Sequence, residues 1–315
     1  MFKKRIFAAI IIAVTFSLTF AGCSNNETKK DKVEKSFDIA VTTENAMKYS
    51  KLFDCDMPVT IAITPDGKIA MERREGYEFF DEALKWENIV QVSAGYNIVC
   101  GLDKSGKVHV ACYEKTAEAI DMSAFTDITY ICATDTGVYG LKKDGTVVST
   151  GRYAQDVSAW KNVKQISAGG DSKEIVMGLC NDGKILVESE YEEIHDAENW
   201  TDIVQISAGR LHVAGVKSDG TVVTCGLPLF EEKGDAGEFD VEGWTDIVYV
   251  TADNQTTVGL KKDGTIVSTG YNASEKYDKW TDAICLYQGG NSAFILKKDG
   301  TMSYSPLGDN FVLLK

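Results

Sequence analysis

Short apolar stretches alternate with tight-turn sequences along most of the chain, and this pattern predicts an all-β protein. One unit reads "DIVQIS" (202–207), "HVAGVK" (212–217) and "TVVTC" (221–225), with a turn between successive stretches. Apolar–polar alternation with β-branched residues is typical of strands. No helical periodicity of useful length follows residue 22, and four prolines with 28 glycines suit short strands joined by turns. We therefore expect antiparallel hairpins throughout.

This three-stretch unit recurs seven times. Its turn glycines are spaced by 36 to 44 residues, about 39 on average. A period of this length is typical of β-propeller blades. Seven such units account for residues 39–315, which predicts one seven-bladed β-propeller and no second domain. The turn glycines are Gly67, Gly106, Gly145, Gly183, Gly220, Gly264 and Gly300.

The turn in most units is Asp-Gly. Pro65 in "TPDGK" fits the first corner of a type I turn, which leaves Gly67 in the left-handed position. The same register places Leu260 opposite Ile266 across the hairpin, with both side chains in one layer.

A phrase led by an aromatic residue begins six of the units. The aromatic residues are Trp86, Phe125, Trp160, Trp200, Trp244 and Trp280. Two residues later stands a short acid or amide: Asn88, Asp127, Asn162, Asp202, Asp246 or Asp282. Such a side chain bonds backbone N–H groups and sets a turn into the inner strand. We interpret these residues as structural, with each Trp packing between neighbouring blades. "YSKLFDCD" (49–56) lies where a seventh, diverged phrase belongs.

A propeller closes its ring, commonly by joining strands from both chain ends in one blade. "FDIAVTT" (37–43) and "NFVLLK" (310–315) are the candidate closing strands.

The N-terminus predicts export. "MFKKR" is a basic segment, and an uncharged apolar stretch follows it up to Cys23. The sequence "LTFAGC" resembles a bacterial lipobox, although Phe20 stands where Leu is usual. The resemblance implies a signal peptide over 1–22 and a lipid on Cys23, which would anchor the protein to the outer leaflet of the bacterial cytoplasmic membrane. A plain secreted protein and an uncleaved anchor remain alternatives. Residues 23–38 are polar and predict a disordered tether.

Charge excludes one class of partner. Residues 1–22 hold three basic and no acidic side chains, so the remainder carries 30 basic and 47 acidic groups, a net charge of −17. Phosphate backbones repel such a chain, so nucleic acid is not expected as a partner. We expect a monomer.

The cysteines do not indicate a metal site. Seven remain after Cys23, an odd number with no CxxC spacing, so zinc is not expected. Most stand in strand patterns, which favours buried free thiols, with disulfides as the alternative in an exported protein. These are Cys55, Cys100, Cys112, Cys132, Cys180, Cys225 and Cys285.

Candidate catalytic chemistry is sparse. The three histidines are His109, His195 and His212, and none falls in a zinc, serine-hydrolase, phosphate-binding or calcium motif. The acidic segment "ESEYEEIHDAENW" (188–200) is interpreted as a solvated surface, with a hydrolase as the less favoured alternative. We expect no enzyme, no cofactor and no metal.

The segment "WTDIVQISAGRLHVAGVKSDGTVVTCG" (200–226) resembles the short bacterial form of the regulator of chromosome condensation repeat. The same short repeat builds a propeller protein that inhibits β-lactamase. The resemblance covers about residues 49–308 and implies a propeller fold, not one activity. The family's histidine is present in this chain only as His212, while other copies have Val99, Val138 or Thr257 near that place. We therefore interpret His212 as a packing residue. The compartment and the lack of long insertions argue against exchange-factor activity, and the inhibitor's contact loops are not visibly shared.

Binding is better supported than catalysis. Loops between the inner and second strands, together with loops after the third strand, share one face of a propeller; we call it the variable face, because these loops differ between copies. The Asp-Gly turns lie on the opposite, nearly constant DG face. A constant frame with varied loops on one face is typical of binding propellers. We predict a protein partner, or a carbohydrate or cell-wall ligand as the alternative, with the insertion 227–243 as first contact loop. The candidate binding residues are Tyr77, Phe79, Tyr113, Tyr153, Tyr191, Phe230 and Tyr271.

Overall fold

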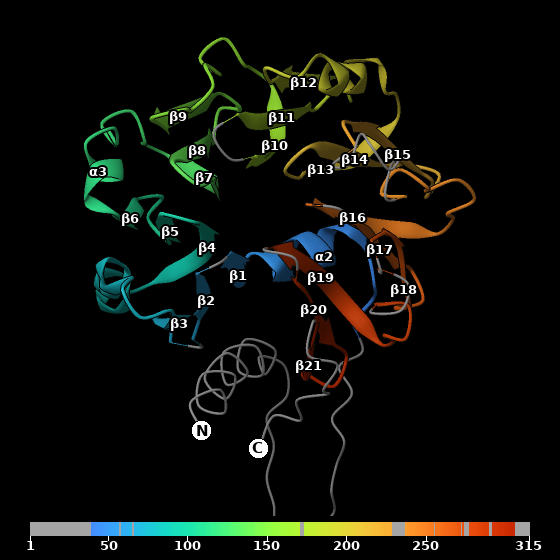
Figure 1. The fold of residues 1–315 in the computed structure, drawn as a ribbon, viewed down its shortest axis with the longest axis horizontal. Helices are drawn as coiled ribbons and strands as arrows, with labels where there is room; N and C mark the ends of the chain where they lie inside the picture. The colour runs from blue at the N-terminus through green and yellow to red at the C-terminus, as the bar shows by residue number, and fades with distance from the viewer. Residues whose placement is uncertain are drawn as a thin grey trace, which may run out of the picture.

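The chain folds into a ring of antiparallel sheets. The computed structural model describes residues 39–305 except 57, 65, 171–172, 229–236, 255, 272, 274–276 and 290–291. This part of the chain contains seven three-stranded sheets. In Figure 1 the sheets follow one another in chain order around the ring, from the blue strands β1–β3 to the red strands β19–β21. The predicted all-β, seven-bladed propeller is confirmed.

Each blade uses one continuous run of three strands. The first four blades are β1 (Phe53–Asp56), β2 (Val59–Ile63), β3 (Ile69–Arg73); β4 (Ile89–Gly95), β5 (Ile98–Asp103), β6 (Val108–Cys112); β7 (Ile128–Ala133), β8 (Gly137–Lys142), β9 (Val147–Gly151); and β10 (Val163–Gly170), β11 (Glu174–Cys180), β12 (Ile185–Glu188). The last three are β13 (Ile203–Ala208), β14 (His212–Lys217), β15 (Val222–Gly226); β16 (Ile247–Asp253), β17 (Thr256–Lys261), β18 (Ile266–Gly270); and β19 (Ala283–Gly289), β20 (Ser292–Lys297), β21 (Met302–Ser305). The helical segments are α2 (Thr43–Ser50), η1 (Glu78–Lys85), α3 (Glu114–Ala117) and η2 (Glu192–Asn199).

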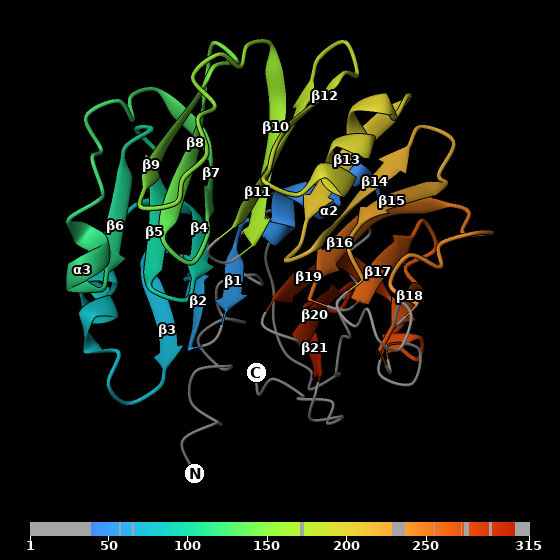
Figure 2. The same ribbon diagram turned by 45° about the horizontal axis from the view of Figure 1, so that its top comes forward.

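The first strand of each blade is the inner one, and the third lies outside, as the tilted view in Figure 2 shows. The hairpin register agrees with the sequence prediction, because Leu260 pairs with Ile266 and both side chains are buried. The turn glycines have positive φ, for example 77° at Gly67, although Pro65 itself lies outside the described residues. β1 also confirms that "YSKLFDCD" contains the inner strand of the first blade.

The acid or amide that follows each aromatic residue adopts a left-handed backbone conformation. These six are the non-glycine residues with positive φ in the described chain, at 57° to 63°. Asn and Asp tolerate this conformation better than other side chains do. The backbone carbonyl of Asp202 accepts a bond from Ser218 N in its own blade at 2.8 Å, while Ile247 N, one residue after Asp246, donates to Gly220 O of the preceding blade at 3.0 Å. The recurring role of this corner in the described blades is therefore a backbone one, rather than the side-chain bonding expected from sequence.

The apolar core is divided among the interfaces between neighbouring blades. One cluster joins Ile61 of β2 to Trp86 and Val92 of the second blade, and five further clusters repeat this arrangement. The predicted packing of Trp between blades is therefore confirmed. The ring of Trp200, for example, also lies against a glycine in the second strand of the same blade. A Cβ added at Gly215 would stand 3.0 Å from this ring. This close approach explains the recurring glycine in the second strand.

Side chains of the inner strands tie adjacent blades together around the axis. Gln91 donates to Ile131 O at 2.7 Å and accepts from Ile131 N at 3.1 Å. Ser93 Oγ accepts from Ala133 N at 2.9 Å. The Gln and Ser of "QISAG" repeat these bonds at the next-blade interfaces of β10 and β13. Inner strands have an unpaired edge in this fold, and these side chains satisfy its backbone groups.

Ring closure differs from the sequence expectation. Residues 39–42 form no strand, and Thr42 instead caps α2 by accepting a bond from Asn45 N. This helix lies near the centre of the ring in Figure 1 and buries Ala46 and Tyr49 in the same cluster as β19. The expectation of a closing strand at 37–43 is therefore wrong for its described residues, and 310–315 lies outside them. The ring closes through packing of the first blade and α2 against the last blade.

The predicted burial of cysteine holds for Cys100, Cys132, Cys180 and Cys285. Cys55, Cys112 and Cys225 are only half-buried, and all seven are free thiols in the structure. Cys132 stands at the place of Ser93 in its blade. Burial raises the pKa of the Cys132 thiol to about 12, and a hydrogen bond from the backbone of Ala168 partly opposes this rise. Its thiol is thus a neutral packing group on the wall of the ring.

Candidate functional site

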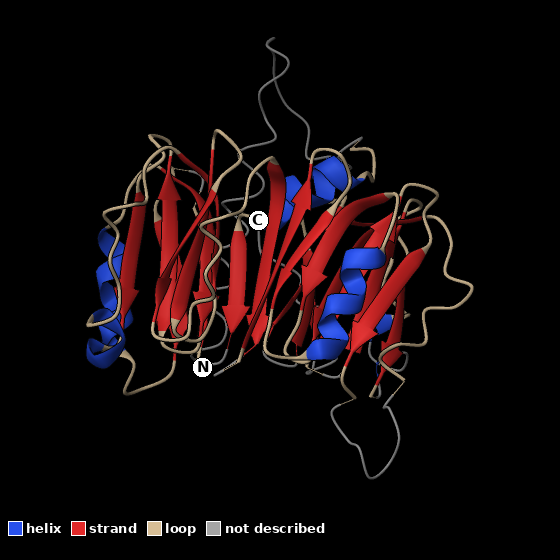
Figure 3. Cartoon of the chain, turned by 90° about the horizontal axis from the view of Figure 1, so that it is seen from above, coloured by secondary structure: helices blue, strands red, loops and turns tan. Residues whose placement is uncertain are grey.

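Strand direction sorts the loops onto two faces, seen edge-on in Figure 3. Ile98 pairs with Gly95 on one side and with Cys112 on the other, so the loop after β4 and the loop after β6 emerge at the same end. The Asp-Gly turns lie at the opposite end. The predicted separation into a variable face and a DG face follows directly from this register.

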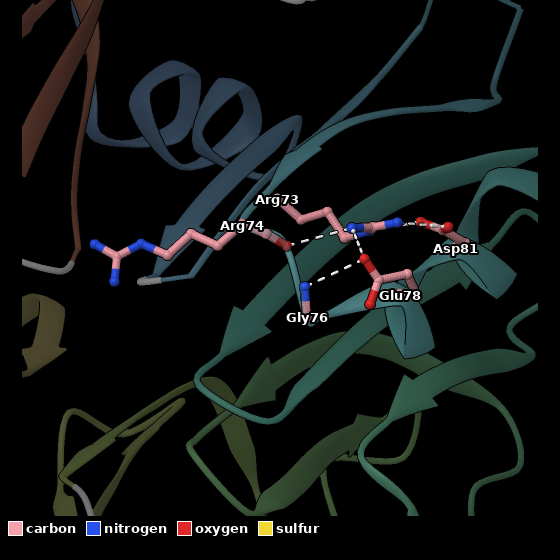
Figure 4. Close-up of polar contacts among 5 residues, drawn as sticks. All are labelled: Arg73, Arg74, Gly76, Glu78 and Asp81. Atoms are coloured by element: carbon pink, nitrogen blue, oxygen red, sulfur yellow. Dashed lines mark hydrogen bonds and ion pairs between the residues drawn. The ribbon is translucent and has the colours of Figure 1, made fainter.

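An arginine clamp shapes the variable face between the first two blades (Figure 4). Arg73, the last residue of β3, makes two bonds to the Asp81 carboxylate, from Nε at 2.7 Å and Nη2 at 2.8 Å. Its Nη1 donates to Glu78 at 2.9 Å, and Glu78 in turn accepts from Gly76 N. Bonding to Asp81 raises the pKa of Arg73 above its already high ordinary value, and bonding to Arg73 lowers the pKa of Asp81. The clamp thus holds the turn that presents Tyr77 against η1.

Four aromatic side chains gather beside this turn, and we call Tyr77, Phe79, Tyr96 and Tyr113 the aromatic patch. The Tyr77 ring lies 5.5 Å from that of Phe79 and 6.0 Å from that of Tyr96, and Phe79 lies 5.7 Å from Tyr113. Tyr77 Oη also donates to Tyr96 Oη at 2.9 Å. The contacts between neighbouring rings make the patch contiguous. Within it, Tyr96 is 43% exposed and Tyr113 is 42% exposed. Tyr77 and Phe79 are half-buried and also pack against the core between the first two blades, so Tyr96 and Tyr113 are the exposed rings of the group. Exposed aromatic rings that lie in a group are typical of binding surfaces.

The other predicted binding residues do not join this patch. Tyr153 and Tyr271 are exposed, at 44% and 56%, and neither ring contacts another aromatic ring of the described residues. Tyr191 packs against the core between the fourth and fifth blades, with Lys173 Nζ 5.1 Å from its ring centre. Phe230 and the rest of residues 229–236 in the insertion 227–243 lie outside the described residues. Tyr96 was not predicted from the sequence; its signal was an aromatic residue at a loop position that is Asp, Gly, Arg or Asn in other copies.

The surroundings of the patch are acidic. Glu75, Glu78 and Glu114 are exposed beside its aromatic residues in the chain. Asp135, on the loop after β7, accepts a bond from Tyr96 N at 3.2 Å. Arg74 and Lys115 are exposed beside the same aromatic residues, so the carboxylates outnumber basic groups there but do not stand alone.

A cavity of about 470 Å³ lies on the ring axis, which the sequence did not predict. All seven inner strands or the loops following them contribute to its wall. It reaches the variable face at Tyr96, Asp135 and Arg210, and at the other end it stops at Ser50 and Lys51, where α2 meets β1. We call this cavity the funnel.

Two buried titratable groups bridge blades without facing solvent. Glu174 of β11 accepts bonds from Thr134 and Tyr139 of the third blade, and burial raises its pKa against these bonds. His212 Nε2 lies 2.9 Å from Thr257 Oγ1, which itself donates to a carbonyl, so Nε2 carries the hydrogen. Burial lowers the pKa of His212 to about 4, and the ring is neutral at physiological pH. Its position agrees with the packing role inferred from sequence.

The remaining candidate chemistry is dispersed. His109 bonds Asp103 at 2.9 Å within one blade, and His195 lies on η2 at the outside of the ring. In the part of the chain that the structure describes, no group of three or more His, Cys, Asp or Glu side chains is arranged to hold a metal ion. Nor does any described helix combine the length and apolar character needed to cross a membrane.

The ring, the repeated Trp–Asp corner and the Asp-Gly turns define a seven-bladed propeller built of repeated hairpin units. Residues 203–229, which start at β13 and include all of the fifth blade, match the model of the regulator of chromosome condensation (RCC1) repeat. The predicted resemblance to this repeat is therefore confirmed. No curated protein matches the chain.

Solved structures of the same architecture resemble the chain at low identity. The CRINKLY WD40 ectodomain of the Arabidopsis thaliana receptor kinase ACR4 has a TM-score of 0.60 at 16% identity, covering 84% of this chain and 97% of that one. Yeast RCC1 (Prp20) bound to Kap60 has a TM-score of 0.54 at 14% identity, covering 90% and 85%. Prp20p from Saccharomyces cerevisiae, studied for its binding to Gsp1p and histones, has 0.51 at 16%, covering 76% of each chain. At these identities the likeness shows the fold alone.

Proposed function

We propose that this chain is an extracytoplasmic, lipid-anchored propeller that binds a protein partner through the aromatic patch and is not an enzyme. The observation that carries the proposal is the patch itself: rings from three separate segments meet on the variable face, and two of them stay more than 40% exposed. Tyrosine provides a large contact area at low conformational cost, which suits it to protein interfaces.

The acidic surroundings indicate the partner's charge. Exposed carboxylates flank the patch, and complementary charge speeds association and selects among partners. We therefore propose a partner that presents a basic surface. Yeast Prp20, which has the same fold, is described as bound to Kap60 and as binding Gsp1p and histones. This precedent supports protein binding by the architecture, and it identifies no partner for this chain.

Anchoring rests on the N-terminal sequence. The basic start, apolar stretch and "AGC" ending support cleavage before Cys23 and attachment of lipid there. The polar residues that follow would hold the propeller at the outer leaflet of the cytoplasmic membrane. Intact-mass measurement of the membrane-extracted protein tests this directly, because an unlipidated N-terminus contradicts the anchor.

Partner binding is tested by affinity capture with the full-length chain in detergent. Tyr96→Ala and Tyr113→Ala remove exposed patch rings, whereas Tyr153→Ala and Tyr271→Ala remove tyrosines outside the patch that are at least as exposed and serve as matched controls. A hot-spot ring is expected to change the partner's Kd by about 30-fold, which corresponds to ~2 kcal/mol. The proposal is wrong if a partner captured by the wild type binds both patch variants unchanged.

The same rings also suit the flat face of a sugar, so cell-wall material is the second candidate ligand. The exposed, hydrogen-bonded hydroxyls of Tyr77 and Tyr96 favour it specifically, because sugars combine apolar faces with hydroxyl groups. Co-sedimentation with purified cell-wall polymer, using the same four variants, distinguishes this ligand from a protein partner.

A further inference from the structure

The funnel is large enough for a ligand of its own. Its volume of about 470 Å³ lies within the roughly 300–1,000 Å³ that small-molecule sites occupy. α2 packs at its inner end, where Thr43 Oγ1 donates to Val248 O at 2.7 Å beside the start of the β16 strand. The lining of the funnel therefore extends from the variable face to Ser50 and Lys51, beside the end of α2.

A lysine marks the inner end. Lys51 Nζ lies 4.6 Å from the centre of the Tyr130 ring, and Tyr130 also lines the funnel. No carboxylate of the described residues lies within ion-pair distance of this ammonium group, although seven ion pairs occur elsewhere. Burial lowers the pKa of Lys51. A partly desolvated cation without a counter-ion attracts an anionic group to the funnel.

Further hydrogen-bond donors lie along the wall. Ser167 Oγ and Ser207 Oγ each accept a backbone N–H of the next blade, from Ala208 and Ala252. A serine hydroxyl can donate as well as accept. Neither hydroxyl donates to another residue in the described chain, whereas the equivalent Ser93 bonds Asp54. The wall thus offers donors suited to oxygen atoms of a ligand.

The outer end has the opposite character. Asp56, Asp135 and Asp253 line the funnel near the variable face, with Arg210 as the nearby cation. These carboxylates repel a ligand that is anionic throughout and favour one whose outer end is positive.

Asp54 also lines the wall, but its carboxylate is already bonded by Tyr287 and by Ala94 N. The funnel therefore has Lys51 at its inner end, a bonded carboxylate on its wall and three carboxylates at its rim.

We propose that the funnel binds a small zwitterion, an amino acid or short peptide with a free carboxylate. Lys51 receives the carboxylate, Ser167 and Ser207 donate to it or to neighbouring carbonyl oxygens, and the ligand's ammonium group faces the rim carboxylates. A bond between charged groups is stronger than a neutral one, so the carboxylate supplies much of the affinity. Of the aromatic patch, only Tyr96 also lines the funnel, at its outer end. Because the carboxylate contacts lie at the inner end, this inference does not depend on the proposed partner binding.

The test is calorimetric titration of the full-length chain in detergent with trialanine, with trialanine amide and with inorganic phosphate. We expect trialanine to bind and its amide to bind about tenfold more weakly or worse, because the amide lacks the charge. Phosphate shares the oxyanion but not the ammonium group, so it is expected to bind more weakly than trialanine.

Variants assign the binding to Lys51. Lys51→Met is expected to lose about tenfold or more in affinity for trialanine, while Lys51→Arg keeps the charge and most of the binding. Lys48→Met is the matched control, because Lys48 lies on α2 three residues before Lys51 and is also near a tyrosine ring, but is outside the funnel. Thermal unfolding of each variant separates loss of the site from loss of fold.

Three results would overturn the proposal: no heat with trialanine, equal binding of trialanine and its amide, or unchanged binding by folded Lys51→Met. Phosphate binding as tightly as trialanine would also overturn it, because the site would then recognise a plain oxyanion.

Discussion

Replacing Gln205 by Leu is expected to destabilise the propeller strongly, although the two side chains have similar size. Gln205 is 1% exposed. Its Nε2 donates to Val250 O at 3.0 Å and to Ile206 O at 2.9 Å, and its Oε1 accepts from Val250 N at 2.9 Å. Leu removes all three bonds and leaves the buried Val250 N–H without a partner.

The magnitude follows from these bonds. A typical bond contributes about 1 kcal/mol net, and an orphaned buried donor costs ~1–3 kcal/mol. Because Ile206 O keeps its bond from Gln165, the loss at that atom is small. We therefore expect the free energy of unfolding to fall by about 2–4 kcal/mol for Gln205→Leu. Glu at the same position replaces a donor by a carboxylate facing carbonyl oxygens, and at neutral pH it is expected to cost more.

Urea unfolding followed by tryptophan fluorescence measures this change, because the tryptophans lie at blade interfaces. The matched control is Val204→Ala at the neighbouring position, which is 36% exposed and is expected to change stability by less than about 0.5 kcal/mol. An unchanged slope with denaturant shows that both variants unfold from the same native state. If Gln205→Leu were as stable as the control, the Gln clamps would not hold the blades together.

Three further variants test the left-handed corner at Asp202, the buried carboxylate of Asp54 and the Arg73 clamp beside the aromatic patch. Asp202→Val is expected to cost about 1–2 kcal/mol more than Asp202→Gly, because φ is +61° there; equal urea midpoints contradict the strained corner. Burial, opposed mainly by the bond from Tyr287, raises the pKa of Asp54 to about 6 from 3.8, so the native state binds more protons than the unfolded chain between these values. The unfolding free energy of wild type relative to Asp54→Asn should therefore fall by ~2 kcal/mol as pH rises from about 4 to 6, and a flat difference refutes this. Arg73→Gln should speed hydrogen exchange of residues 74–80 while leaving the turn 143–146 unchanged, since the clamp orders only its own turn.

The hairpins and the blade number were predictable because each depends on residues close in sequence. An Asp-Gly turn, its left-handed glycine and the pairing of Leu260 with Ile266 lie within one hairpin. Sevenfold repetition made the signal stronger than any single copy. α2 escaped prediction because only two turns of helix are present, and its buried Ala46 and Tyr49 find their apolar partners on β19, at the far end of the chain.

The candidate sites depended on distances that the sequence does not contain. Tyr77, Phe79 and Tyr113 were predicted as binding residues, but so were Tyr153 and Tyr271, and local sequence offered no way to separate the grouped rings from the single ones. The Gln and Ser of "QISAG" recur visibly, yet each bonds a strand about 40 residues away, so their role needed the ring.

The sequence by itself determined the blade, the number of blades and the face on which loops vary, because hairpin geometry is local and the repeat copies it. Only the tertiary structure decided which aromatic side chains meet, where α2 lies and how Lys51 reaches the axis beside Tyr130. Closing the ring brings these groups together, and that closure is a property of all seven blades at once.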